Sequence, residues 1–306
     1  MNVHVNPLRY TFVPVTNCDM CGDSAELHRT LGQRLNKSQG FNPKSKSGIS
    51  VSVKRCKNCG LIYSDPQPRP YSINDHYGIP PESYWSSDYF QWDESYFQKY
   101  IDKAKKIINF QSGMKALDIG SGTGKILLSL SNAGFDTYGV EPSEPFRERA
   151  LEFTKIPSEK LQLSSVEEVD FPENEFDFIV INAVAEHVFS PSVIILKALK
   201  WIKPGGVILV SVPSADYLVT NIIDAYFKVI GTLYTSHISP MHEPFHLFEF
   251  TLKSFEENGK RLGYKIADSF FDVCPIPFFP KILHPVLRKY MEITKTGMDL
   301  DVWIQK

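Results

Sequence analysis

Four of the five cysteines in the 306-residue sequence fall into two Cys-x-x-Cys units. The units read "CDMC" and "CKNC", and they contain Cys18, Cys21, Cys56 and Cys59. Two such pairs separated by a loop can place four thiolates around one tetrahedral zinc ion. Four protein ligands leave no position for a substrate, so we expect a structural Zn2+, with redox disulfides or free thiols as the alternative. The fifth cysteine, Cys274, is expected to be an isolated thiol.

A glycine-rich turn lies in "KALDIGSGTGKILLSL", a segment that predicts a strand, a tight turn and a helix. The turn carries Gly120, Gly122 and Gly124. A dinucleotide fingerprint needs its third glycine where Lys125 stands, and a P-loop needs Ser or Thr where Ile126 stands. The turn therefore predicts a ligand that lies close to the backbone. It matches neither the dinucleotide fingerprint nor the P-loop.

Two carboxylates stand at predicted strand ends beside this turn. Asp118 closes the strand before the turn, where an acidic group disfavours a pyrophosphate but suits an ammonium and a sulfonium. Glu141, in "GVEPS", can accept two hydrogen bonds from a ribose diol. The helix N-terminus favours an amino-acid carboxylate. Together these features predict an adenosine that carries a zwitterionic amino acid and a sulfonium.

Strands and helices alternate through the middle of the chain. Strands are expected at 115–120, 137–142, 161–165, 176–184 and 207–213, helices at 125–134, 143–153 and 190–202, and a turn at "KPGG". This alternation indicates right-handed crossovers and a parallel sheet. A further helix at 251–263 precedes strands at 264–272 and 298–306. We expect only a loop between these last two strands, which then form an antiparallel pair at one edge.

Three parts are expected along the chain. Residues 1–65 form a zinc-binding module, 66–112 a Pro- and Tyr-rich connector with a helical cap, and 113–306 the ligand-binding domain. Residues 214–244 form an insertion whose amphipathic segment is a candidate lid. The cap helix is expected to bury one stripe, made of Tyr96, Tyr100, Ala104 and Ile107.

The composition is that of a globular protein, with 42% hydrophobic and 22% charged residues. The formal net charge of -2 provides no strong field for a polyanion. No stretch approaches the ~18 uninterrupted apolar residues of a membrane span, and the first residues show no signal-peptide pattern. We therefore expect a cytoplasmic location, no membrane partner and no nucleic-acid partner. The oligomeric state is left open.

The segments "ALDIGSGTG", "YGVEPS", "FPENEFDFIVINAVAEHV" and "LKWIKPGGVILVSVP" resemble class I S-adenosylmethionine-dependent methyltransferases in their order and spacing. The resemblance covers about residues 113–213, and the edge strands extend it to 306. It implies an α/β, Rossmann-like fold with a seven-stranded, mostly parallel sheet in the order 3-2-1-4-5-7-6, the seventh strand antiparallel. The zinc module and the helical insertion would be additions to this fold.

The same resemblance implies the cofactor S-adenosyl-L-methionine and a set of residues that bind it. Those residues are Asp118, Gly120, Ser121, Gly122, Gly124, Glu141, Ser165, Val166, Asn182 and Ala183, with Ser164 beside them. Among the tyrosines of the connector, Tyr77, Tyr84 and Tyr89 are candidates to line the pocket, and most tyrosines in such a run simply pack.

The zinc-ribbon-like head followed by "GLIYSDPQP" and a Tyr-rich segment is similar to a subgroup that acts in sugar, polysaccharide or natural-product pathways. Deoxysugar C-methyltransferases share this layout, but they carry a Tyr-x-Glu-His cluster where this chain reads "SPMHEPFHLFEF". The resemblance therefore implies a small-molecule acceptor, most simply a hydroxyl group of a sugar or secondary metabolite.

Methyl transfer to a hydroxyl needs alignment and removal of the hydroxyl proton. Candidate catalytic residues are His187 after the fourth strand and, after the insertion, His242, Glu243 and His246. Each of them has a structural alternative, as a residue that pins a loop or is half buried in a strand. His237 in the insertion is a weaker candidate.

Three other functions are compatible with the sequence. An RNA methyltransferase could use the zinc module as a clamp, because lysines and arginines concentrate there, although the net charge of -2 opposes it. A C-methyltransferase of a deoxysugar shares the layout. A scaffold protein could retain the fold and bind the cofactor without turnover, but the intact glycine turn and Glu141 favour an enzyme.

Overall fold

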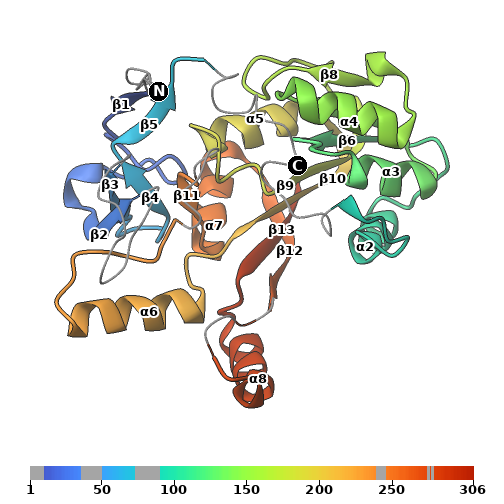
Figure 1. The fold of residues 1–306 in the computed structure, drawn as a ribbon. Helices are drawn as coiled ribbons and strands as arrows, with labels where there is room; N and C mark the ends of the chain where they lie inside the picture. The colour runs from blue at the N-terminus through green and yellow to red at the C-terminus, as the bar shows by residue number, and fades with distance from the viewer. Residues whose placement is uncertain (1–9, 36–49, 73–89, 239–245, 274–275, 277–278) are drawn as a thin grey trace, which may run out of the picture.

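The computed structural model describes residues 10–35, 50–72, 90–238, 246–273, 276 and 279–306. Its central sheet contains seven strands in the order β12-β13-β10-β9-β6-β7-β8 (Figure 1). In that order their bounds are Lys265–Asp272, Asp299–Gln305, Ile202–Pro213, Phe176–Asn182, Lys115–Ile119, Asp136–Glu141 and Leu161–Leu163. The five strands from β10 to β8 are parallel, and β13 is antiparallel to both of its neighbours. The predicted strand order and the antiparallel seventh strand are thus confirmed.

Helices cover both faces of this sheet. They are α2 Gln98–Ile107, α3 Lys125–Asn132, α4 Glu144–Thr154, α5 Pro191–Trp201 and α7 Leu252–Leu262, and a 3-10 turn, η4 Ser158–Lys160, precedes β8. Successive residues of β9 point to opposite faces. Phe178 and Val180 pack with α2 and α3, whereas Ile179 and Ile181 pack with α5 and α7. Both faces of the central strand are therefore buried, as its continuous apolar run requires.

Two expectations for single elements are wrong, and a third is only partly right. The "KPGG" segment, predicted as a turn, lies within β10, where the pairing with β9 shifts register between Ile202 and Val207. The two last strands are joined by more than a loop, because η5 Lys281–Leu283 and α8 His284–Thr294 lie between them. In the cap helix α2, the buried residues are Ile101 and Ala104 rather than the whole predicted stripe.

A smaller sheet holds the N-terminal segment. Its order is β11-β4-β3-β2, with bounds Phe248–Glu249, Ile62–Asp65, Ser50–Arg55 and Arg29–Leu35. A two-stranded sheet pairs β1 Tyr10–Val13 with β5 Gln67–Pro70, and η1 Ala25–Leu27 precedes β2. Since β11 comes from the C-terminal part of the chain, this sheet joins the two ends of the sequence. The start of the predicted connector contributes β5.

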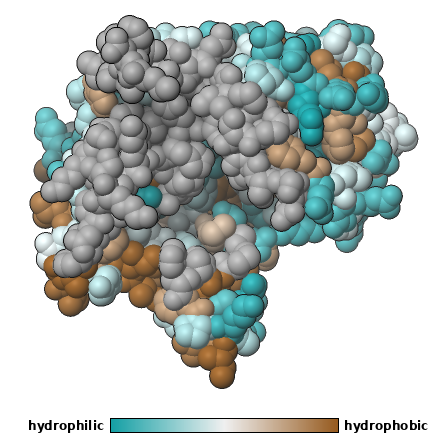
Figure 2. All heavy atoms as spheres, viewed as in Figure 1, coloured by the Kyte–Doolittle hydropathy of each residue, from teal (hydrophilic) through white to brown (hydrophobic). Residues whose placement is uncertain are grey.

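Two helices project at the bottom of Figure 1: α6 Leu218–Val229, after β10, lies below the smaller sheet, and α8, between β12 and β13, lies below the central sheet. They share a small core of their own, in which Val219, Ile276 and Met291 are buried. A hydrogen bond from Leu218 N to Thr296 O (3.1 Å) ties the two insertions together. Figure 2 shows hydrophobic side chains on the outer surface where these helices lie.

Candidate active site and metal centre

The glycine turn between β6 and α3 needs glycine for two separate reasons. Gly120, Gly122 and Gly124 all have positive φ angles of +71°, +53° and +84°. A Cβ atom on Gly120 would lie 2.4 Å from Cγ2 of Val184, whereas a Cβ atom on Gly122 would meet none of the described residues within 4 Å. The N–H groups of Gly120 and Ser121 donate to Val140 O on β7 at 2.8 and 3.0 Å. The turn is thus fixed against the sheet and leaves space above Gly122.

Asp118 and Glu141 are buried on either side of this turn. Glu141 accepts hydrogen bonds from Gly122 N (2.8 Å) and Ser143 N (2.9 Å). Burial raises the pKa of Glu141 to about 7. Burial and the nearby Glu141 raise the pKa of Asp118 well above its usual value, and its Oδ2 atom has no hydrogen-bond partner among the described residues.

These two carboxylates fit a cationic ligand. Within the described part of the chain no Lys or Arg forms an ion pair with either of these two buried acids. A buried carboxylate without a partner is costly, and a ligand ammonium or sulfonium would relieve that cost. The N-terminus of α3 at Lys125 offers backbone N–H groups to a ligand carboxylate.

The other expected cofactor residues line the same edge of the sheet. Ser165 and Val166 are buried after β8, and Ser164 N donates to Glu141 O at 3.2 Å. Asn182 ends β9, and Ala183 after it has a φ of +54°, which an L-residue adopts at a cost. Hence the segment after β8 and the end of β9 both lie at the carboxyl edge that carries the glycine turn.

His187 and His246 come together at this edge. Their ring centroids are 4.6 Å apart, with the ring planes at 83°. Leu247 N donates to the backbone O of Glu186 at 2.6 Å, which fixes the segment after the insertion against the turn that follows β9. Two candidates that are 59 positions apart in the sequence thus form one cluster.

Glu186 is a residue of this cluster that sequence reasoning missed. Its Oε1 lies 4.0 Å from Nε2 of His187, and its Oε2 has no hydrogen-bond partner among the described residues. Burial, together with the nearby Asp299, raises its pKa to about 8. The only signal in the sequence was its place beside His187 in "AEHV". Ligand atoms of Glu186, His187 and His246 lie within 4.8 Å of one another and could also hold a cation.

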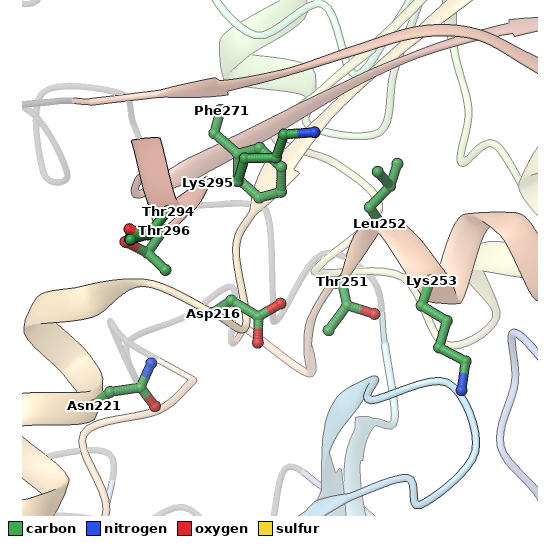
Figure 3. A pocket seen from close by; sticks show the side chains of 9 residues that line it. All are labelled: Asp216, Asn221, Thr251, Leu252, Lys253, Phe271, Thr294, Lys295 and Thr296. Carbon is green, nitrogen blue, oxygen red and sulfur yellow. The ribbon is translucent and has the colours of Figure 1, made fainter. Parts of the chain in front are cut away.

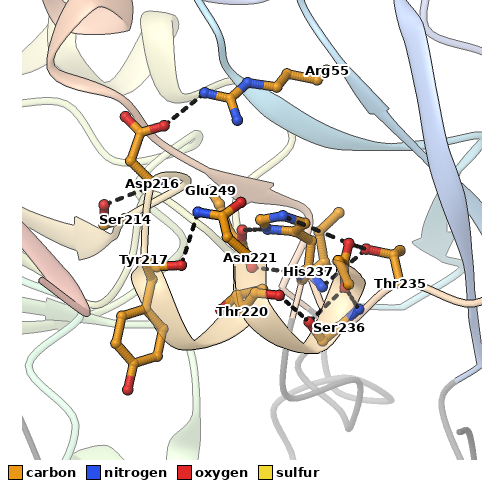
Figure 4. Close-up of polar contacts among 12 residues, drawn as sticks. Arg55, Ser214, Asp216, Tyr217, Thr220, Asn221, Thr235, Ser236, His237 and Glu249 are labelled. Carbon is orange, nitrogen blue, oxygen red and sulfur yellow. Dashed lines mark hydrogen bonds and ion pairs between the residues drawn. The ribbon is translucent and has the colours of Figure 1, made fainter. Parts of the chain in front are cut away.

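His237 is surrounded by polar groups that hold the insertion in place. Its Nδ1 is 2.6 Å from Oε2 of Glu249, and its Nε2 is 3.8 Å from Oδ2 of Asp224 (Figure 4). Asp224 also accepts from Ser236 N at 2.6 Å. On the other side, Arg34 of β2 donates to Ile238 O at 3.2 Å. His237 therefore holds the insertion against the N-terminal sheet.

The remaining candidates lie outside the described residues. They are His242, Glu243, Tyr77, Tyr84, Tyr89 and Cys274.

An open pocket of about 380 Å³ lies beyond the end of β10, among α6, α7 and α8 (Figure 3). Its lining residues are Asp216, Asn221, Thr251, Leu252, Lys253, Phe271, Thr294, Lys295 and Thr296. Asp216 is held by Arg55 of β3 at 2.6 Å. None of the lining residues belongs to the glycine turn, so this pocket is separate from the candidate cofactor site.

The four cysteines of the two Cys-x-x-Cys units converge. Sγ of Cys18 is 3.5 Å from Sγ of Cys59, and Sγ of Cys21 is 3.6 Å from Sγ of Cys56. Four thiolates at ~2.3 Å from one tetrahedral zinc would lie about 3.8 Å apart, whereas a disulfide needs ~2.05 Å. The four sulfurs thus fit a Zn2+ ion and not two disulfides. Gly22 and Gly60, with φ angles of +79° and +80°, shape the turns that aim the sulfurs inward.

The cysteine turns pack directly on the helices of the central sheet. The Asp19 carboxylate accepts from Ser190 Oγ (2.6 Å) and from Ser192 N (2.7 Å), so that it caps α5 from another part of the chain. Asn258 of α7 donates to Met20 O at 3.0 Å. Thr251, which caps α7, donates to Cys59 O at 2.6 Å. Ser190, at the N-cap position of α5, thus serves as a donor to Asp19 rather than as the side-chain acceptor.

The family model for a methyltransferase domain matches residues 92–268. A ubiquinone biosynthesis O-methyltransferase from Bradyrhizobium diazoefficiens is 32% identical over 117 residues, 36% of this chain and 44% of that protein. A demethylmenaquinone methyltransferase from Geobacillus is 23% identical over 165 residues, 51% of this chain and 70% of that protein. This chain thus spans less than half the length of the first of these relatives.

Among solved structures, a putative S-adenosylmethionine-dependent methyltransferase from Listeria monocytogenes is similar, with a TM-score of 0.48 and 15% identity. The match covers 70% of this chain and 97% of that structure.

None of the described helices is both long enough and apolar enough to cross a membrane.

Proposed function

We propose that this chain, which belongs to the methyltransferase-domain family, is an S-adenosylmethionine-dependent methyltransferase whose acceptor is a hydroxyl group of a small molecule. The observation that carries the assignment of the cofactor site is the pair of buried carboxylates, Asp118 and Glu141, beside a glycine turn with space above Gly122. When bound, the cofactor supplies an electrophilic methyl group on sulfur.

We assign separate tasks to the residues around the turn. Glu141 would accept hydrogen bonds from the ribose hydroxyls, and Asp118 would balance the positive charge of the amino-acid part. The N-terminus of α3 would receive the carboxylate, because the Gly122 N–H already donates to Glu141. Ser165 and Val166 would border the adenine, and Asn182 and Ala183 the amino-acid part.

The His187–His246 pair would remove the acceptor proton. An alcohol must lose its proton as the new C–O bond forms, and an imidazole near neutrality is suited to accept it. The carboxyl group of Glu186 lies 4.0 Å from His187. In its ionised form this carboxylate would stabilise the imidazolium that forms when the histidine accepts the proton. The perpendicular arrangement of the two rings lets one histidine position the other.

The acceptor class follows from this chemistry. A hydroxyl of a sugar or secondary metabolite, which the sequence layout favours, and a ring hydroxyl of the type that the names of the relatives indicate both need the same base. Turnover assays with members of both classes separate them. An enzyme that methylates only carbon or nitrogen acceptors would contradict the proposal.

His187→Ala and His246→Ala test the base. Replacing the true base should lower turnover by roughly 10²–10⁴ and leave the dissociation constant of S-adenosylmethionine nearly unchanged. Melting curves of both variants identify a purely structural histidine, whose loss lowers stability but not the turnover of the folded fraction. Full turnover in both variants would remove the histidines from the mechanism.

We also propose one structural zinc ion per chain, bound by Cys18, Cys21, Cys56 and Cys59. The distances between their sulfurs support this, and elemental analysis of the purified protein measures it. A metal content near zero, with all four thiols freely titratable in the native state, would contradict the zinc site.

A further inference from the structure

The two insertions at the carboxyl edge of the sheet form a separate helical body. α6 follows β10, whereas η5 and α8 follow β12, and the two meet over Val219, Ile276 and Met291. Arg288 also donates to Val273 O at 2.8 Å, which anchors α8 to the end of β12. Because β10 and β12 both end at this edge, the helical body and the glycine turn lie on the same side of the sheet.

The apolar face of α8 is wider than this small core covers. Leu287 and Met291 pack inward, but another row at the same helical spacing stays outside. Ile282 is 85% exposed, Val286 70% and Ile293 70%. Leu283 and Tyr290 lie in the same row and are also exposed. A folded chain rarely leaves such a cluster of large apolar side chains in water without a partner.

α6 adds to this surface. Ile222, Tyr226 and Val229 recur at helical spacing, and Val229 is 85% exposed. Leu233, after the helix, is exposed too. In Figure 2 the brown atoms gather at the free end of α8 and along the outer side of α6. The two helices thus present neighbouring apolar faces on one projecting part of the molecule.

The charge around this face selects the kind of partner. Residues 281–295 contain four basic residues, Lys281, Arg288, Lys289 and Lys295, and one acidic residue, Glu292, for a formal net charge of +3. The chain as a whole carries -2. Two copies meeting through this face would bring like charges together. A surface that is apolar within and negative outside, such as an anionic lipid bilayer, complements both properties.

We propose that η5, α8 and the outer face of α6 dock on an anionic membrane surface. Ile282, Val286 and Ile293 would enter the boundary between headgroups and acyl chains, and Lys281 and Lys289 would contact the lipid phosphates. The absence of a membrane partner was expected from the lack of a spanning stretch. A helix that lies in the interface needs no such stretch, and α8 with 11 residues is far too short to span. Docking would place the carboxyl edge of the sheet, and the proposed acceptor site, near lipid-soluble acceptors.

Vesicle sedimentation with the full chain tests the proposal. The protein should pellet with vesicles of phosphatidylcholine mixed with phosphatidylglycerol, and much less with phosphatidylcholine alone or in high salt. The double variant Val286→Asp/Ile293→Asp should lower the partition coefficient by roughly tenfold or more, because it removes two buried apolar side chains. Lys281→Gln/Lys289→Gln should lower it only for the anionic vesicles.

Leu27→Asp is the matched control, since Leu27 is 68% exposed but lies in η1, outside α6 and α8. It should bind the vesicles as the unaltered protein does. Calorimetry with S-adenosylmethionine on every variant confirms that the cofactor site is intact, so a failure of docking is distinguishable from a failure of the proposed function. Equal binding of all variants, or no binding by the unaltered protein, would overturn the proposal. So would a dimer that Val286→Asp/Ile293→Asp converts to a monomer without vesicle binding.

Discussion

Glu141 is the residue whose ionisation should control cofactor affinity. Burial raises its pKa to about 7, and only the ionised form can accept hydrogen bonds from both ribose hydroxyls through its two oxygens. The affinity for S-adenosylmethionine should therefore rise with pH through about 7 in the unaltered protein. Glu141→Gln should weaken binding, by up to ~1.5–3 kcal/mol for each charged hydrogen bond lost, and should remove the pH dependence.

Calorimetric titration at several pH values measures both effects. Glu144→Gln is the matched control, because Glu144 is exposed in the first turn of α4 and should leave affinity and its pH profile unchanged. An unchanged dissociation constant in Glu141→Gln would mean that the cofactor binds elsewhere.

Glu186 should make the protein less stable at high pH. Burial raises its folded-state pKa to about 8, above the unfolded value of 4.5, so the folded state binds the proton more tightly. The resulting stabilisation is complete below pH 4.5 and is lost as the pH rises to about 8. Glu186→Gln should accordingly unfold at higher denaturant concentration than the unaltered protein at pH 8, by an amount on the order of 2 kcal/mol. Near pH 5 the two proteins should have similar free energies of unfolding. If the difference is the same at both pH values, Glu186 does not titrate as a buried group.

At the level of residues, the sequence predicted the surroundings of the glycine turn more completely than those of the proposed base. Asp118 and Glu141 could be predicted because each closes an apolar strand next to a glycine turn, a local pattern. Glu186 could not, because its burial depends on Leu247, which is 61 positions away by its number and binds the Glu186 backbone across the site. The pairing of His187 with His246 has the same origin in tertiary packing.

His237 fixes the insertion that contains α6. Burial alone would lower its pKa, but the carboxylates of Glu249 on β11 and Asp224 on α6 outweigh it and raise the pKa, while Arg55 on β3 acts in the opposite direction. Arg34 on β2 faces the same group of acids. The stabilisation is therefore complete below pH 6.5, the unfolded value, and is lost as the pH rises through the folded value.

Hydrogen exchange of α6 can follow this contact. After correction for intrinsic exchange rates, the protection of α6 should decrease as the pH rises above 6.5, and His237→Gln should lack this decrease and lose about 1 kcal/mol or more of protection at pH 6. Amides of β9 in the central sheet serve as the internal reference. Identical pH profiles of α6 in both proteins would show that His237 does not hold the insertion.

Asp19 connects two elements that the sequence analysis treated as separate. Because its carboxylate supplies the cap that α5 lacks from Ser190, Asp19→Ala should cost about 1–2 kcal/mol of unfolding free energy. Denaturant unfolding measures the change, with the exposed Glu26→Ala as the control from the same module. A loss no greater than that of the control would exclude a capping role.

The elements themselves could be predicted where their pattern is local. The alternation of strand and helix patterns in the sequence predicts the parallel strands and their helices, and these are confirmed. Only a loop between the two last strands is expected where α8 lies, although the apolar residues of this segment recur at helical spacing. β5 was read as a connector because of its prolines, which an edge strand tolerates.

On the scale of the whole molecule, the N-terminal module is built into the methyltransferase part. β11, from beyond the insertion, pairs with β4, so the smaller sheet is completed by a strand from the C-terminal half of the chain. The cysteine turns in addition bind α5 through Asp19 and α7 through Asn258 and Thr251. Sequence boundaries cannot reveal such integration, because the strand that completes the small sheet contributes only Phe248 and Glu249.

The metal site should therefore stabilise the whole chain and not only its first residues. Removal of zinc by a chelator, or Cys21→Ser, should free the turns that contact α5 and α7 and cost several kcal/mol, lowering Tm by roughly 10 °C or more. Circular dichroism and cofactor calorimetry should show one cooperative transition, in which secondary structure and S-adenosylmethionine binding are lost together. Cys274→Ser, the cysteine outside the two units, is the matched control and should melt as the unaltered protein does. Two separate transitions, with cofactor binding intact after the first, would instead make the zinc module an independent unit whose contacts with α5 and α7 add little to the stability of the methyltransferase fold.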